Sequence, residues 1–183
     1  MIRRYVAEWF GSTVNGMLFS ESTTGDVADL RRYVAGSSDA EIFVRHGGSG
    51  AVIVSDAGEA GELPSGRKFV SRFSGGRFGK AGGQWLFHVA LWTPGDYRDE
   101  FLAWYQIEHL PILLECPLWD GCRFVEEAVQ EGCQFHAMHQ LSDAKALESE
   151  QRLRSRSTPW FKRLAKNDWF DGAFKRTLYR RAS

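Results

Sequence analysis

Residues 85–92, Trp-Leu-Phe-His-Val-Ala-Leu-Trp, form an apolar run that only His88 interrupts. A strand with one face in solvent alternates apolar and polar residues, whereas a short run without alternation is typical of a strand covered on both faces. Eight residues also suit a strand better than a helix. The segment therefore predicts a central strand with a packed layer on each side.

A helix is expected directly after this strand. Pro94-Gly95 turns the chain, and apolar residues then recur at helical spacing up to His109. Pro111 has no amide proton and disfavours the helical conformation at the residue before it. We therefore expect the helix to break or kink just after His109.

The remaining segments complete a recognisable order. Strands over residues 123–130 and 134–141 flank a Glu-Gly turn, helices begin at Asp143 and at Thr158-Pro159, and a last strand covers 174–181. The order β-α-β-β-α-β predicts an α+β, ferredoxin-like fold with both helices on one sheet face. The other face stays apolar and requires a second sheet, so we expect a barrel-like sandwich, closed within one chain or between two.

The first part of the chain predicts the same order without a second helix. A helix is expected over residues 26–35, and strands over 14–19, 41–45, 51–55 and 67–73. We predict a degenerate ferredoxin-like half over residues 1–75, a Gly-rich linker over 76–83 and a complete half over 84–183. The alternative is a separate decoration over residues 1–83, with two chains pairing through their second halves.

Composition narrows the class of protein. The 183 residues are 43% hydrophobic, but no run approaches the roughly 20 apolar residues of a membrane span, and the start lacks the apolar region of a signal peptide. We therefore expect a cytoplasmic protein without a membrane partner. Three cysteines without metal-ligand spacing indicate buried thiols, so neither a disulfide framework nor a metal site is predicted. We expect no cofactor.

The zero net charge is unevenly distributed. Residues 96–131 hold nine acids and two bases, whereas residues 152–181 hold ten bases and two acids. These two segments are expected to meet across a subunit contact. Nucleic acid is an alternative partner for the basic segment, but its interleaved aromatic residues favour core packing, and no nucleic acid is predicted. The glycines of residues 75–83 lead into a strand rather than a helix, which favours a linker over a phosphate loop.

Several blocks of sequence resemble the EthD-like branch of the dimeric α/β-barrel proteins, over about residues 84–181. They are Trp104-Tyr105, Glu108-His109-Leu110-Pro111, the strand 135–141, Thr158-Pro159-Trp160 and Tyr179-Arg180-Arg181. The resemblance implies a ferredoxin-like fold, a homodimer formed by sheet packing, and a small-molecule cavity between sheet and helices. Its superfamily includes cofactor-free monooxygenases, isomerases, polyketide cyclases and dehydratases, so the fold does not choose the chemistry. The first half departs from the pattern because it has no second His-x-Pro.

His109 is the main candidate for proton transfer, because an imidazole titrates near neutral pH. Its neighbour Glu108 is a second catalytic candidate, although it points about 100° away around the helix. Trp104 and Tyr105 are candidates for substrate contact. The alternative for His109 is a structural cap at the end of its helix.

Two further histidines are expected on one surface. His88 and His136 lie on strands that the fold makes neighbours, and alternation points both to the same side. They are candidate substrate-binding residues together with Trp92, and their alternative is a polar contact between sheets. His139 lies on the opposite side and is expected to pack under a helix.

These features predict a small enzyme that uses histidine-mediated proton transfer on a hydrophobic, aromatic or polyketide-like molecule. The reaction would be an isomerisation, dehydration, cyclisation or cofactor-free oxygenation. The alternative is a non-catalytic dimer that binds a small ligand or has a structural role.

Overall fold

The computed structural model describes residues 17–22, 27, 30, 31, 40–56, 69–79, 82–127 and 129–183. Of the helix expected over residues 26–35, Val27, Leu30 and Arg31 lie within these ranges and are helical. The start of the first expected strand and the loop 57–66 lie outside the described residues. No helix within the described ranges is long and apolar enough to span a membrane.

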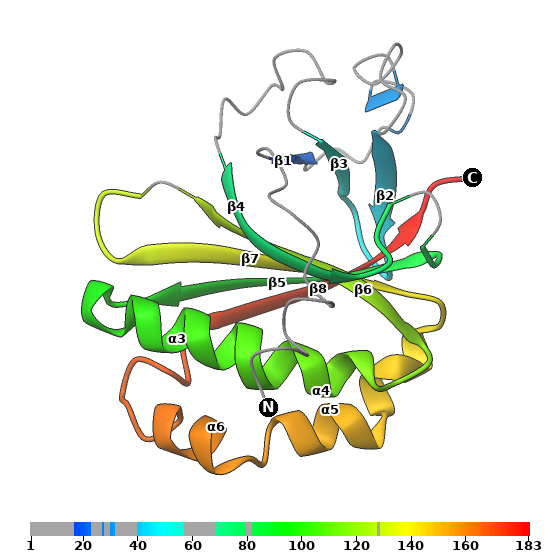
Figure 1. Cartoon of the computed structure of the whole chain (residues 1–183). Helices are drawn as coiled ribbons and strands as arrows, with labels where there is room; N and C mark the ends of the chain where they lie inside the picture. Colours follow the sequence, from blue (N-terminus) through cyan, green and yellow to red (C-terminus); the bar gives the residue numbers. More distant parts are fainter. Residues whose placement is uncertain are drawn as a thin grey trace.

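The second half forms the predicted four-stranded unit. Its strands are β5 (Trp85–Thr93), β6 (Trp119–Glu127), β7 (Cys133–Leu141) and β8 (Phe174–Arg181). They lie in the order β8-β5-β7-β6, and every neighbouring pair is antiparallel. This is the ferredoxin-like order, and the predicted α+β class is confirmed. Figure 1 shows the helices of this half together on one side of the sheet.

The long helix after β5 does not break at Pro111. The 3-10 turn η1 (Gly95–Tyr97) leads into α3 (Arg98–Trp104), then the π-helical turn η2 (Tyr105–His109), then α4 (Leu110–Leu114). The Leu110 amide donates to the Tyr105 carbonyl, five residues back. This wider turn leaves room for the proline ring, which would otherwise clash with the preceding turn. Of the two expected outcomes the break is therefore wrong: the irregularity before Pro111 is a π-helical turn, and His109 lies within a continuous helical rod.

Two short helices complete the helical layer. After the 3-10 turn η3 (Ala144–Glu148) come α5 (Glu150–Ser155) and α6 (Pro159–Leu164). Ser149 accepts a hydrogen bond from the Arg152 amide, and Thr158 accepts one from the Phe161 amide, so both helices begin at a side-chain cap. The acidic and basic segments meet here within one chain, through the ion pair of Arg163 with Glu100 (2.9 Å).

The first half adds four strands to the same sheet. They are β1 (Met17–Ser22), β2 (Glu41–Arg45), β3 (Ala51–Asp56) and β4 (Phe69–Gly76). The eight strands lie in the order β1-β3-β2-β8-β5-β7-β6-β4, and the edge strands β1 and β4 approach each other. The barrel therefore closes within one chain (Figure 1). Around the closed barrel, the strands of the first half lie in the order β4-β1-β3-β2. This order is equivalent to the order β8-β5-β7-β6 of the second half, which supports our proposal of a fused repeat.

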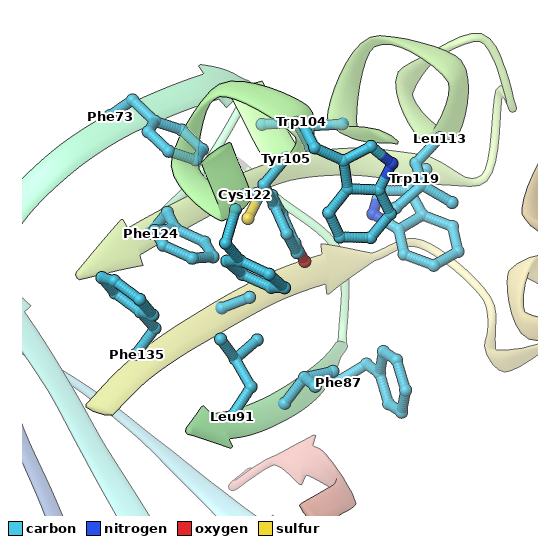
Figure 2. Close-up of a cluster of buried hydrophobic side chains, with 14 of the residues drawn as sticks. Phe73, Phe87, Leu91, Trp104, Tyr105, Leu113, Trp119, Cys122, Phe124 and Phe135 are labelled. Carbon is cyan, nitrogen blue, oxygen red and sulfur yellow. The ribbon is translucent and has the colours of Figure 1, made fainter. Parts of the chain in front are cut away.

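Two apolar cores lie on opposite faces of β5. The barrel interior joins side chains of both halves: Phe43, Val52, Val54, Leu86, Val125, Met138 and Tyr179. The larger core lies between the sheet and the helices, and Figure 2 shows strand residues such as Phe124 and Phe135 packed near Trp104 and Tyr105 of the helix. Each face of the apolar strand β5 thus has its own packed layer, as its sequence predicts.

The Gly-rich segment is held against the sheet. Gly75 and Gly76 extend β4 beyond its predicted end. The Gly79 amide donates to the Gln140 side chain (2.7 Å) and the Gly83 amide to Asp120 (3.1 Å). These amides are already engaged within the protein, which disfavours the phosphate interpretation.

Candidate functional site

A cavity of about 360 Å³ lies between the sheet and the helices of the second half. Aromatic side chains dominate its wall: Phe87, Trp104, Tyr105, Trp119, Phe161, Phe170 and Phe174. They come from β5, the long helix, β6, α6, the segment after α6 and β8, so the cavity requires both layers of the ferredoxin-like half. Its size lies within the usual range for small-molecule pockets.

His109 borders this cavity. Its ring packs against the rings of Trp104 (4.5 Å between centroids) and Tyr105 (4.8 Å). Nδ1 lies 3.4 Å from the Ser155 carbonyl oxygen. A carbonyl only accepts hydrogen bonds, so Nδ1 carries the proton and Nε2 carries the lone pair. Burial, opposed by the bond to Ser155 and aided by nearby arginines, lowers the pKa of His109 to about 4.

A second polar group reaches the same cavity from the sheet. The Trp119 indole donates from Nε1 to Nδ1 of His139 (3.0 Å), so the neutral imidazole carries its proton on Nε2. That proton is donated to the Tyr105 hydroxyl oxygen (2.7 Å). The hydroxyl proton of Tyr105 is then available for another acceptor. Burial raises the pKa of Tyr105 and lowers the pKa of His139 well below its usual value, so both groups are uncharged at neutral pH.

Four charged side chains also line the cavity. Arg152 lies on α5, Arg156 follows it, and Arg176 lies on β8, where it is the cross-strand neighbour of Val89. Asp171 is the one acid in the lining. The charged lining therefore has an excess of positive charge.

Two predicted site residues lie away from the cavity. The Glu108 carboxylate accepts a hydrogen bond from Thr158 (2.5 Å), which caps α6. The Trp92 indole donates to the Glu131 carbonyl oxygen (3.2 Å), and 37% of the side chain is exposed. Glu108 turns away because it is one helical position from His109, and Trp92 lies on the sheet face opposite Leu91.

His88 and His136 lie on the other sheet face, in the barrel interior. Nε2 of His88 is 2.9 Å from Nδ1 of His136, and Nε2 of His136 is 3.0 Å from a Glu127 carboxylate oxygen. The expected adjacency of the two histidines is found. They do not line the cavity, and the whole strand layer separates them from His109. No group of three or more His, Cys, Asp or Glu residues in the described ranges is arranged to hold a metal ion.

The sequence interpretation missed the polar partners in the cavity. His139 lies under a helix, as expected, but its side chain borders the cavity between the sheet and the helices. Alternation along β7, which puts His136 and His139 on opposite faces, was the available signal. For the three arginines, the sequence shows only that they belong to a basic segment.

The fold and the cavity together define a class: a ferredoxin-like α+β barrel with a small-molecule pocket between sheet and helices. No family model and no curated protein matches the sequence. Solved structures do match it. A ferredoxin-fold protein related to antibiotic biosynthesis monooxygenases, from Listeria monocytogenes, superposes with a TM-score of 0.67 at 13% identity, over 94% of this chain and 96% of that one.

Two further structures have similar scores. An anthrone oxidase-like protein has a TM-score of 0.64 at 14% identity, over 94% of this chain and 93% of its own. A heme-degrading enzyme from Listeria monocytogenes has a TM-score of 0.62 at 14% identity, over 91% of this chain and 99% of its own. At these identities the likeness establishes the fold alone.

Proposed function

We propose that the protein binds a hydrophobic, aromatic or polyketide-like molecule in this cavity and removes a proton from carbon, with His109 as the base. One observation carries the proposal: a neutral imidazole with a free lone pair and an uncharged Tyr105–His139 pair line the same aromatic cavity. Such a pairing of a base with a hydrogen-bond donor suits enolate chemistry.

The proposed step moves one proton and one electron pair. The C–H proton beside a substrate carbonyl passes to Nε2 of His109. The bonding pair forms the enolate, whose oxygen accepts a hydrogen bond from the Tyr105 hydroxyl. His139 supports this donor by hydrogen bonding to the Tyr105 oxygen (2.7 Å). The negative charge of the enolate would raise the basicity of the neighbouring imidazole as it forms.

Removal of a proton from carbon is a first step shared by isomerisation, dehydration, cyclisation and cofactor-free oxygenation. The anthrone oxidase-like structural neighbour supports an aromatic substrate. Membership of the EthD-like branch is part of this proposal, carried by the sequence blocks that include Glu108-His109-Leu110-Pro111. Glu108 is not included, because its carboxylate is engaged by Thr158.

Solvent deuterium exchange tests the base directly. Anthrone and 2-tetralone have acidic methylene protons, and mass spectrometry reports their replacement by deuterium. We expect the protein to accelerate exchange and His109→Gln to return it to the buffer rate, with folding verified by circular dichroism. His46→Gln is the matched control, because His46 is exposed and outside the cavity.

The alternative function, a non-catalytic ligand binder, predicts a different result. These ketones would then bind without exchange, and His109→Gln would change affinity alone. Exchange that persists unchanged in His109→Gln would remove this residue from the chemistry.

A further inference from the structure

We propose that the ligand of this cavity is an aromatic carboxylate, whose carboxylate is held by Arg152, Arg156 and Arg176 while its rings lie against the aromatic wall. The inference deepens the proposed function by naming the substrate class. It rests on the same cavity, but not on proton transfer by His109.

The three guanidinium groups converge on the cavity from both layers. Arg152 lies over the ring of Phe87 (5.9 Å to the centroid), and Arg176 lies over the ring of Phe174 (4.8 Å). Arg156 lowers the pKa of both other arginines, although burial is the larger cause in each case. The three charges are therefore close enough to repel one another, and an anion placed among them would interact with all three.

The arginines of the cavity lack the acidic partners that other arginines of the chain have. Arg154 pairs with Glu115 and Arg163 with Glu100, yet no ion pair to Arg152, Arg156 or Arg176 occurs in the part of the chain that the structure describes. Arg152 does donate to a carbonyl oxygen, that of Leu147 (2.6 Å). Arg152 and Arg176 are partly desolvated, and such cations without a counter-charge favour an external anion.

The surroundings favour a carboxylate attached to rings. Guanidinium groups bind planar carboxylates in two parallel hydrogen bonds, and the aromatic wall lies next to them. A volume of about 360 Å³ suits a molecule of a few fused rings. Asp171 would repel a second anionic group on the ligand, so a monoanion fits best.

Anion binding would also change His109. Arg156 and Arg152 contribute to the lowered pKa of this imidazole, after burial. A bound carboxylate offsets their charge, so the pKa of His109 should rise toward its ordinary value. The bound ligand would thus make the neighbouring His109 a stronger base.

The test compares 2-naphthoate with 2-naphthamide, which has the same rings and a similar planar group without the charge. Dissociation constants are measured by isothermal titration calorimetry at pH 7.5, for the wild type and for Arg176→Gln, Arg176→Lys and Arg154→Gln. Arg154 is the matched control because it lies on α5 outside the cavity and pairs with the exposed Glu115.

We expect the wild type to bind 2-naphthoate on the order of tenfold more tightly than 2-naphthamide. Arg176→Gln should remove most of this preference, Arg176→Lys should keep part of it, and Arg154→Gln should leave it unchanged. The preference should also shrink at high salt. The comparison in the wild type stands even if an Arg176 variant fails to fold.

Equal affinity for the acid and the amide would overturn the inference, as would no binding of either probe at millimolar concentration. A preference lost equally in Arg154→Gln would also overturn it, since general surface charge would then explain the binding. The same titrations on His109→Gln separate the two proposals: an intact preference there supports the carboxylate site even if deuterium exchange shows no catalysis.

Discussion

Replacing His109 should reduce the acid sensitivity of the fold. The pKa of this imidazole is about 4 in the folded protein, against 6.5 for an ordinary histidine. Between pH 6.5 and 4 the unfolded chain therefore binds a proton at this residue, whereas the folded protein does not. The contribution of His109 to the free energy of unfolding is present above pH 6.5 and is lost as the pH falls through this window. At about 1.4 kcal/mol for each pKa unit, the full loss is about 3 kcal/mol, of which about 2 kcal/mol is reached at pH 5.

Urea denaturation followed by tryptophan fluorescence measures this loss. The free energy of unfolding is compared at pH 7.5 and pH 5 for the wild type, His109→Gln and the control His46→Gln. His139 is buried neutral too and keeps its own share of the pH dependence. Lost packing against Trp104 is the same at both pH values and cancels in the comparison.

The wild type should therefore lose about 2 kcal/mol more than His109→Gln on going from pH 7.5 to pH 5. His46→Gln should follow the wild type. If wild type and His109→Gln lose the same stability within about 0.5 kcal/mol, the burial of His109 as a neutral group is refuted.

Three further predictions use other parts of the fold. Gly83→Ala should lower the free energy of unfolding, measured in urea, by about 1–3 kcal/mol, because the new methyl would lie 2.1 Å from the Leu141 carbonyl oxygen. Its control Gly95→Ala should be nearly neutral, because the new methyl would have no atom within 4 Å. Tyr105→Phe should cost about 1–3 kcal/mol by leaving the His139 donor unpaired, and should slow deuterium exchange more than binding. The family resemblance implies a homodimer formed by sheet packing, but here the first half supplies the second sheet within the chain. Light scattering should therefore give the mass of one chain, 20.7 kDa, and a stable dimer would contradict this reasoning.

The order of strands and helices was predictable because it depends on local patterns. The apolar run of β5 gives a strand covered on both faces, and alternation along β5 and β7 brings His88 next to His136. The path of the long helix was not predictable in the same way. Rules based on neighbouring residues take account of the ring and the missing amide proton of Pro111, and they predict an interrupted helix. The π turn accommodates the proline by adding one residue to the helix. It also lets Tyr105 and His109 both pack toward the cavity.

The composition of the site was less accessible to sequence reasoning. Alternation places His139 beneath the helices, but spacing does not show whether a side chain there is packed or borders a space. That depends on the volume left by side chains from all four strands of the second half and from its helices. Arg152 on α5 and Arg176 on β8 are likewise 24 positions apart in the sequence, and the fold brings both to the wall of the cavity.

The fused barrel also fixes how many ligands each chain should bind. Residues 142–173, thirty-two in number, separate β7 from β8 and supply Arg152, Arg156 and Phe161 to the cavity. Residues 57–68, only twelve, separate β3 from β4 at the equivalent place in the first half. A dimer of two complete halves would have two cavities. In this chain only the second half has the long segment that supplies cavity residues, so one cavity is expected. Calorimetric titration with 2-naphthoate should therefore give one site per chain, and a stoichiometry of two would mean that the first half has a cavity of its own.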